Sequence, residues 1–478
     1  MRLDVGALAS LPPAVQRPSY DIDAQKAGIV HFGIGAFHRA HQAVYTDDAM
    51  NAGERDWGIT GVSLRSVNVA EQLRPQEGLY TVASRSGGES ALRVIGAVRG
   101  LLVAPQEPQA VVEAVAAPET HIVSFTVTEK GYCRAGDGSL DPSLAGDDSI
   151  YYFLRAGLAL RRESGLPGLT LLSCDNLAHN GAQLRRLTLA YLSSRDSALA
   201  DWVEAHCTFP SSMVDRIVPA TTASDRDTAQ ASLGGVRDEA HVTTEPFSQW
   251  VIEDRFAGPR PRWEAHGAEL VADVASYETA KLRMLNGAHS ALAYIGLMHR
   301  HDFVHQAVAD PAIRPLVERL MREEAAPSIA AAPGQDLAAY AGALLARFEN
   351  TALHHRLIQI AMDGSQKIPQ RWLETLAINA EKGRRCPAIL TAIGAWLAHV
   401  RGDNGPVDDP LSAQLSALWR RADAAATARA IFMRDGPLAG RWRPDDADIA
   451  AIAGAVSPTG RAPNSRTALR SKSGVAPT

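Results

Sequence analysis

The pattern of hydrophobic and polar positions divides the chain near residue 277. Before this point, short apolar runs alternate with stretches of helical periodicity, which is typical of a mostly parallel sheet with helices on both faces. Beyond it, the strand-like runs disappear, and alanine- and leucine-rich stretches of helical periodicity follow one another. We therefore predict an α/β domain over residues 1–276, a mostly α-helical domain over residues 277–456 and a disordered tail over residues 457–478.

The same pattern predicts the individual elements. In the first domain we expect strands at residues 28–32, 57–64, 79–84, 92–100, 121–128, 169–173 and 245–256. Helices are expected there at residues 36–50, 107–116, 151–164 and 182–206, and the polar segment 221–240 is expected to be a loop. In the second domain we expect helices at residues 277–298, 308–325, 335–349, 352–362, 370–380, 387–402, 410–421 and 424–433.

Composition points to a soluble globular protein. Apolar residues make up 46% of the chain, charged residues 21%, and the formal net charge is −5. This balance lacks the strongly basic face of a nucleic-acid or membrane partner, and no run approaches the roughly 18 apolar residues that a membrane span needs. The N-terminus lacks the apolar stretch of a signal peptide, and the four scattered cysteines form no CxxC motif. We therefore expect a cytoplasmic protein with reduced thiols, and neither a nucleic-acid nor a membrane partner.

A glycine turn near the N-terminus is the first candidate for binding chemistry. The expected strand 28–32 leads into Gly33-Ile34-Gly35, and the expected helix begins with Ala36-Phe37-His38-Arg39. Strand, glycine turn and helix form the context in which a dinucleotide fingerprint is credible. The first glycine permits the turn, and the second lets the backbone approach a pyrophosphate. The third position of the fingerprint holds His38 instead of glycine, so a plain strand–helix turn stays an alternative.

The end of the second strand is where a ribose-reading side chain is expected. An acidic residue there would accept a hydrogen bond from the ribose 2′-hydroxyl and would repel a 2′-phosphate. The sequence Arg65-Ser66-Val67-Asn68 contains no carboxylate. Asn68 is suited to bond a ribose hydroxyl and Arg65 lies close by, so these residues leave the choice between NAD and NADP open.

Polar residues also follow later strands of the predicted sheet. Asp175 and Asn176 come directly after the strand 169–173, where ligands bind in open α/β sheets. The alternative for both is capping of the next helix. Asp215 and Arg216 lie between apolar neighbours, and a plain salt bridge would explain that pair equally well.

The segment 277–292 carries the strongest catalytic candidates. On one α-helix, at 100° per residue, His289 would lie about 80° and Asn286 about 140° from Lys281. A lysine whose pKa falls on burial can take a hydroxyl proton, and neutral donors can hold the oxygen as charge develops. The three side chains therefore suit a reaction at a C–OH/C=O centre. An amphipathic helix with a solvated lysine is the alternative.

A metal centre is not expected. The close histidine pairs lack the HExxH pattern and have no neighbouring cysteine cluster; they are 38 and 41, 299 and 301, and 354 and 355. Within the helical domain, the segment 363–369 (DGSQKIP) interrupts the helices with turn chemistry and a lysine. A capping turn and a loop at the edge of a pocket both fit this segment.

Taken in order, these stretches resemble the mannitol 2-dehydrogenase family, the polyol-specific long-chain dehydrogenases, which also contains fructuronate reductases. The resemblance extends over nearly the whole chain apart from the tail, in the blocks GIVHFGIGAFHRAHQ (28–42), TVTEKGY (126–132), SCDNLAHNG (173–181), MVDRIVP (213–219), EPFSQWVIEDRF (245–256), KLRMLNGAH (281–289) and DGSQKIP (363–369). The family signature Lys-x4-Asn-x2-His is met by Lys281, Asn286 and His289.

The resemblance implies a Rossmann-like domain, a helical domain, an active site between them and no metal. It implies that Lys281 is the general base, that Asn176 and Asn286 form an oxyanion hole and that His289 orients the reacting oxygen. Glu278 would match the family's carboxylate that assists proton exchange with solvent. Asp215 and Lys367 would match pocket residues that hold cofactor or substrate.

Two departures from the family pattern concern specificity. Some members carry an acidic pair where this chain has Val67-Asn68, and some carry an arginine where this chain has Gln359 in the substrate pocket. We therefore expect a metal-independent dehydrogenase that interconverts a polyol and its ketose with NAD, with mannitol and fructose as the first pair and NADP still open. A fructuronate reductase, acting on an aldonate, is the nearest alternative. A catalytically silent nucleotide-binding sensor is the remote one.

Overall fold

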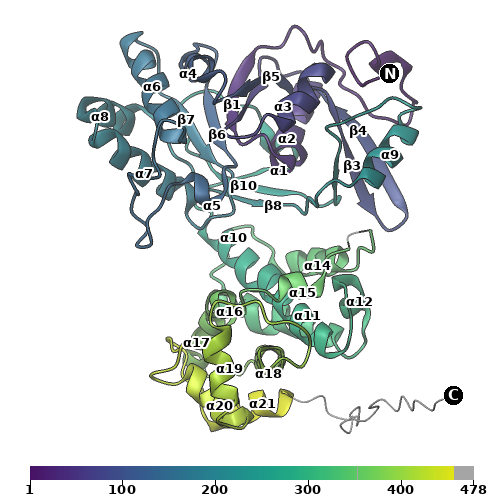
Figure 1. The fold of residues 1–478 in the computed structure, drawn as a ribbon, viewed down its shortest axis with the longest axis vertical. Helices are drawn as coiled ribbons and strands as arrows, with labels where there is room; N and C mark the ends of the chain where they lie inside the picture. The colour runs from purple at the N-terminus through teal and green to yellow at the C-terminus, as the bar shows by residue number, and fades with distance from the viewer. Residues whose placement is uncertain (353, 457–478) are drawn as a thin grey trace, which may run out of the picture. The chain divides into compact units, whose positions relative to one another are not determined.

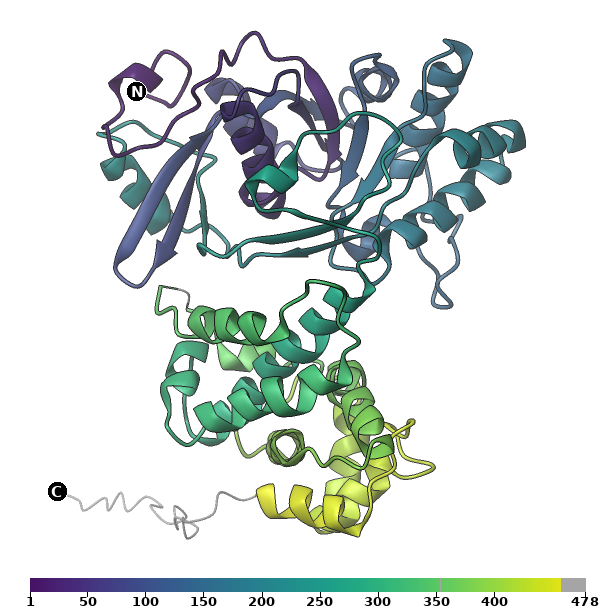
Figure 2. The same cartoon turned by 180° about the vertical axis from the view of Figure 1, so that it is seen from behind.

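The computed structural model describes residues 1–352 and 354–456, and the expected tail lies outside the described residues. The chain divides into two compact units. The first consists of residues 1–279 with two short segments, 331–335 and 350–352, and the second contains the rest of the described chain. Figures 1 and 2 show a mixed α/β fold in the first unit and an arrangement of helices in the second.

The first unit is built on a five-stranded parallel sheet. Its strand order is β5-β2-β1-β6-β7, formed by β1 (Ala27–Phe32), β2 (Gly58–Ser63), β5 (Val98–Val103), β6 (Ile122–Phe125) and β7 (Thr170–Ser173). Every residue of β6 and β7 is buried, as expected for a parallel sheet covered on both faces. The predicted fold class, a Rossmann-like α/β domain followed by a helical region, is confirmed.

Helices cover both faces of this sheet. Successive side chains of each strand point to opposite faces, so each face contributes its own apolar side chains to a helix layer. On one face Val30 and Phe32 of β1 pack with the helices α4 (Pro108–Ala116), α6 (Ile150–Glu163) and α7 (Asn180–Ser193). On the other face Ile29 joins a cluster with Ala43 and Met50 of α2 (Gln42–Asn51) and Leu73 of α3 (Asn68–Leu73). This alternation leaves His31 on the second face, within an otherwise apolar strand.

Two small sheets complete the unit. One has the order β4-β3-β9, with β3 (Tyr80–Ser86), β4 (Glu89–Ile95) and β9 (Val242–Thr244). The other has the order β11-β10-β8, with β8 (Ser212–Asp215), β10 (Gln249–Glu253) and β11 (Glu269–Val271). The single strand predicted at residues 92–100 is wrong. A break at Gly96-Ala97 separates β4 from β5, and the two strands belong to different sheets.

Three other predictions for this unit need correction. The predicted helix 36–50 is two helices, α1 (Ala36–Ala40) and α2, because His41 leaves helical geometry at φ −123° and ψ −95°. The predicted helix 182–206 is likewise two, α7 and α8 (Ser197–His206). The predicted loop 221–240 contains α9 (Ala223–Ser232), which a capping box between Thr222 and Asp225 begins. This surface helix has one buried residue, so its apolar periodicity was too weak to indicate it.

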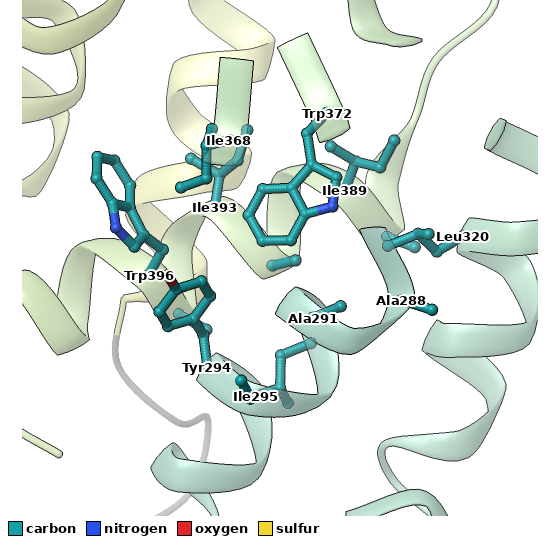
Figure 3. Packing of buried hydrophobic residues seen from close by; sticks show 14 of the residues in the cluster. Ala288, Ala291, Tyr294, Ile295, Leu320, Ile368, Trp372, Ile389, Ile393 and Trp396 are labelled. Atoms are coloured by element: carbon teal, nitrogen blue, oxygen red, sulfur yellow. The ribbon is translucent and has the colours of Figure 1, made fainter. Parts of the chain in front are cut away.

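Within the described residues of the second unit, the regular elements are helices joined by turns and loops. Its elements are η4 (Lys281–Asn286), α11 (Gly287–Met298), α12 (Val304–Ala309), α13 (Arg314–Arg319), η5 (Leu320–Ala325), η6 (Ala326–Ser328), α14 (Leu337–Phe348), α15 (Leu357–Ile360), α16 (Gly364–Ile368), η7 (Pro369–Leu373), α17 (Glu374–Glu381), α18 (Pro387–Arg401), α19 (Ser412–Trp419), α20 (Ala424–Phe432) and α21 (Asp446–Ala455). The last of these was not predicted. At the centre, Tyr294 of α11 packs among Trp372 of η7 and Trp396 of α18 (Figure 3).

The segment 277–292 is not one α-helix, as had been predicted. It consists of the end of α10 (Ala275–Ala280), the π-helix η4 (Lys281–Asn286) and the start of α11. The elements η5 and η7 are π-helices as well. Both π and α segments read as helical in an apolar pattern, so periodicity did not distinguish them.

Candidate functional site

The glycine turn after β1 is shaped by close contacts. Gly33 has φ +100°, and its N–H donates to the Val62 carbonyl at 2.9 Å. A Cβ at Gly33 would overlap the Thr126 carbonyl, whereas a Cβ at Gly35 would meet no atom nearer than 3.8 Å, the Gly33 oxygen. The turn therefore needs glycine first for its conformation, and the missing side chain of Gly35 leaves one side open. Such an open cradle fits the pyrophosphate of a dinucleotide.

The predicted cofactor residues at this turn differ in their exposure. Ile34 and His38 are buried, Arg39 is 6% exposed, and Ala36 and Phe37 are half-buried. The His38 ring stacks on His31 with 3.5 Å between ring centroids, and Arg39 donates to the Ala240 carbonyl. These two polar side chains are therefore engaged in the packing of the unit beneath the turn.

A buried polar network supports the turn, and sequence reasoning missed it. His31 Nε2 lies 2.8 Å from the Thr126 hydroxyl, which donates to the Gly33 carbonyl at 2.7 Å. His31 Nδ1 lies 2.8 Å from the Ser124 hydroxyl oxygen, which is also 2.9 Å from Gln42 Oε1, and in the neutral ring Nδ1 accepts the Ser124 hydroxyl proton while Nε2 donates to Thr126. Burial lowers the pKa of His31 to about 3, so its ring is neutral at physiological pH. The sequence feature that could have indicated this network is His31 itself, a polar residue inside an otherwise apolar strand.

Asp175 joins the ends of two neighbouring strands. Its carboxylate accepts the N–H groups of Val127 at 3.1 Å and Thr128 at 2.8 Å, both just after β6, and the Tyr132 hydroxyl at 3.0 Å. Burial raises its pKa. The capping alternative is wrong for Asp175 and Asn176, because α7 begins after His179 and has no side-chain cap. Asn176 is exposed, directly beyond the buried end of β7.

Three further predicted residues of this unit lie on a strand or a helix. Asp215 is the last residue of β8, is buried and pairs with Gln249 of β10. Glu278 is half-buried on α10, and its Oε1 accepts the N–H of His179 at 3.1 Å. Burial raises the pKa of Glu278, which brings a carboxyl closer to proton exchange at neutral pH. Asn68, the first residue of α3, is exposed.

The π-helix η4 sets the geometry of the catalytic candidates in the second unit. Hydrogen bonds in a π-helix run from i to i+5, so Lys281 and Asn286 lie one turn apart on the same face. The separation of about 140° predicted for an α-helix is therefore wrong. His289 follows three residues later in α11, about 60° around the axis from Asn286. The structure thus brings the three residues of the signature to one side of the helix.

His289 is neutral in this environment. Its ring is half-buried and packs against Phe348 at 4.7 Å and edge-on to His355 at 5.4 Å between centroids. Burial, with the nearby His355, Arg347 and Arg371, holds its pKa well below the usual value. A neutral imidazole can donate a hydrogen bond to a reacting oxygen without adding a charge.

Arg371 and Trp372 of η7 brace the junction between η4 and α11. Arg371 donates to the Asn286 carbonyl at 3.2 Å and to the Ser290 hydroxyl at 2.7 Å. The Trp372 indole donates to the Gly287 carbonyl at 3.2 Å. Sequence reasoning missed both residues, although they follow directly after the DGSQKIP block.

That block holds Lys367 near this junction. The Lys367 amine, on α16, donates to the carbonyls of Met362 at 2.5 Å and Ile360 at 3.4 Å. Burial and the neighbouring Arg371 lower its pKa. Gly364 begins α16 against the core, where a Cβ would lie 2.5 Å from both Trp396 Nε1 and the Tyr294 hydroxyl (Figure 3 labels both aromatic residues). Gln359, on α15, is exposed.

Three features of the described residues concern metal ions, disulfides and membranes. Within residues 1–352 and 354–456, three or more His, Cys, Asp or Glu side chains nowhere gather as they would to hold a metal ion. All four cysteines are buried and unbridged. None of the helices in the described part of the chain combines the length and apolar character needed to cross a membrane.

Comparison with known proteins identifies the family of the chain. Residues 27–265 match the mannitol dehydrogenase Rossmann domain, and residues 273–435 match the mannitol dehydrogenase C-terminal domain. D-mannonate oxidoreductase of Escherichia coli (strain K12) is 40% identical over 446 residues, 89% of this chain and 91% of that protein.

Two solved structures are similar over almost the full length. D-sorbitol dehydrogenase in substrate-free form has a TM-score of 0.87 at 33% identity, over 95% of this chain and 96% of its own. Pseudomonas fluorescens mannitol 2-dehydrogenase, in a ternary complex with NAD and D-mannitol, has a TM-score of 0.78 at 35% identity with the same coverage. The chain therefore belongs to the mannitol dehydrogenase family.

Proposed function

We propose that this protein is an oxidoreductase that interconverts a polyol and its ketose by hydride transfer with NAD, with mannitol and fructose as the first pair. The observation that carries the proposal is the π-turn that places Lys281 and Asn286 on one face, with neutral His289 beside them. Membership of the family supports the reaction class, and the NAD and D-mannitol complex of the Pseudomonas fluorescens relative supports the cofactor and substrate.

In this proposal the protein's own groups handle the proton and the oxygen. In the oxidation direction, Lys281 accepts the hydroxyl proton as the carbon gives its hydride to bound NAD. Asn176 and Asn286 donate hydrogen bonds to the alkoxide-like oxygen, and His289 orients it. Glu278, whose raised pKa suits exchange, passes the proton between Lys281 and solvent. No metal takes part.

The cofactor is assigned to the first unit and the substrate to the second. The segment 33–39, with Asn68 and Asp215, would bind NAD around the open glycine turn, and Lys367 and Gln359 would contact the far end of the substrate. The boundary between these functions is proposed at residues 276 and 277. On composition we further propose a cytoplasmic location, with neither a nucleic-acid nor a membrane partner.

A fructuronate reductase is the second candidate, and two observations favour it. One is the similarity to D-mannonate oxidoreductase. The other is Lys367, a cation on a half-buried helix that is suited to pair with a substrate carboxylate. Turnover measured with mannitol and with mannonate, each with NAD and NADP, separates the two candidates. Higher kcat/KM on mannonate would assign the aldonate reaction and overturn mannitol as the substrate.

The central test is the variant Lys281→Ala. We expect turnover to fall at least about 100-fold because the general base is lost, whereas NADH binding, measured by fluorescence titration, is retained. The matched control is Lys382→Ala, which removes an exposed lysine of the same unit. Full turnover in Lys281→Ala would refute the assigned role. Cofactor binding without turnover by the unmodified protein, across a panel of polyols and aldonates, would instead indicate a silent sensor.

A further inference from the structure

A pocket of about 450 Å³ lies at the carboxyl ends of two strands of the parallel sheet. Arg65 enters it from the loop after β2, and Glu129, Lys130 and Arg134 enter from the segment after β6. Cys133, Ala135 and Leu144 complete the lining. The lining therefore contains three cationic side chains and one carboxylate, and this excess of positive charge suits an anionic ligand.

The position of the pocket in the sheet indicates what kind of ligand it takes. β2 and β6 flank β1 in the order β5-β2-β1-β6-β7, so the chain reverses its direction of strand addition at β1. Ligands of such sheets bind at this switch point, with the pyrophosphate at the turn after the first strand and the ribose at the end of the second. The pocket contains Arg65, two residues beyond the end of β2 at Ser63, and so corresponds to the adenosine half of a dinucleotide.

The charges at the end of β2 suit a phosphate better than a bare ribose. The sequence from Arg65 to Asn68 offers no carboxylate to accept a bond from a 2′-hydroxyl or to repel a 2′-phosphate. Arg65 and Lys130 are both exposed at the pocket, and Arg134 is held in place by donating to Gln183 at 2.5 Å. Charge-assisted bonds from arginine are the usual means of binding phosphate.

The wall of the pocket is built on a constrained loop. Thr128 at φ +63° and Cys133 at φ +50° adopt left-handed conformations at the two ends of the segment that carries Glu129 and Lys130. Such conformations are strained for a non-glycine residue and persist where the surroundings enforce them. Here Asp175, just beyond β7, accepts the Thr128 N–H and the Tyr132 hydroxyl, and Tyr132 also contacts Ser173 of β7. Leu144, with 54% of its surface exposed, adds an apolar face on which an adenine ring can pack.

We propose that this pocket binds the 2′-phosphorylated adenosine of NADP, so that the protein accepts NADP as well as NAD. The inference rests on the proposed function for the presence of a nicotinamide cofactor. It adds a site for the 2′-phosphate, formed by Arg65 and Lys130 and supported by Arg134.

The test uses the adenosine half alone, so that binding is measured without turnover. Adenosine 2′,5′-bisphosphate and 5′-AMP, which differ only in the 2′-phosphate, are titrated calorimetrically into the full chain. We expect the 2′-phosphorylated nucleotide to bind at least about tenfold more tightly, since it gains charge-assisted bonds that 5′-AMP lacks. Arg65→Ala and Lys130→Ala should each remove most of this preference. Arg195→Ala, at an exposed arginine outside the pocket, is the matched control and should keep it.

Equal binding of the two nucleotides, or a preference that survives both alanine variants, would overturn the proposal. Thermal melts of each variant report whether it is folded, and both substituted side chains are exposed, which favours folding. If the bisphosphate binds as expected and the protein turns over no polyol or aldonate, the pocket assignment stands and the proposed function fails. If turnover with NAD is found but the 2′-phosphorylated nucleotide is not preferred, the proposed function stands and the pocket assignment fails.

Discussion

The guanidinium of Arg371 donates to the backbone carbonyl of Asn286 at 3.2 Å. The contact joins two π-helices, since Asn286 ends η4 and Arg371 lies within η7. Arg371 also bonds Ser290, so it fixes the junction at which η4 passes into α11. Arg371 is thus a positioning residue that would act on the reaction through Asn286.

We predict that Arg371→Leu lowers kcat at least about tenfold, because small displacements of catalytic groups have large effects on rate. Substrate KM should change less, and Arg371→Lys should restore part of kcat by keeping one donor. Steady-state kinetics with the proposed substrate measure both quantities. Trp372→Phe, which removes the donor to Gly287 and shortens a buried ring, is the comparison variant. A proportional loss of kcat and folded protein in Arg371→Leu, with no rescue by lysine, would mean that the role is structural only.

The close approach at Gly364 gives a prediction for stability. In Gly364→Ala the new methyl group would lie 2.5 Å from Trp396 Nε1 and from the Tyr294 hydroxyl, so the core must shift. We expect a loss of about 1–3 kcal/mol in the free energy of unfolding, together with a change in substrate KM because Lys367 is on the same short helix. Gly440→Ala, where nothing lies within 4 Å, is the control. Chemical denaturation of both variants measures the difference, and equal stability would contradict the packing argument.

Buried neutral histidines make stability depend on pH. The pKa of His31 is about 3 in the folded protein, below its ordinary value of about 6.5 in the unfolded chain. Below pH 6.5 the unfolded state therefore binds more protons, and stability falls as the pH falls towards 3. The expected slope from this residue is about 1.4 kcal/mol per pH unit. The pKa values of His38 and His289 are shifted in the same direction by burial.

Denaturation curves recorded at several values between pH 5 and pH 7 measure this slope. His31→Gln should reduce the slope, whatever its effect on stability at pH 7, and His206→Gln serves as a surface control. An unchanged slope in His31→Gln would show that His31 is protonated in the folded state or is not a source of the pH dependence.

The sequence predicted the parallel sheet well because its strands are short apolar runs between turn residues, as at β6 and β7. It failed at residues 221–240, where a surface helix depends on a capping box instead of an apolar face. At the candidate site, the sequence identified the residues that carry the chemistry but did not predict their geometry. Lys281, Asn286 and His289 were identified, yet their angular relation came out wrong because a π-turn leaves no mark in hydrophobic periodicity. Asp175 and Arg371 were missed as supporting groups because their partners are distant in sequence.

The π-turn at Lys281–Asn286 also limits how the length of the chain can vary. A π-turn holds one residue more than an α-turn, and here buried residues lie on both sides of it, Ala280 before and Leu292 after. Removing one residue would let the segment close into an α-turn. Leu292 would stay in the core, but Lys281 and Asn286 would lose their spacing. Adding one would rotate α11 by about 100° and turn Leu292 out of the core. We conclude that this stretch does not tolerate the insertions and deletions that loops absorb, and that its length is as much a part of the site as its side chains.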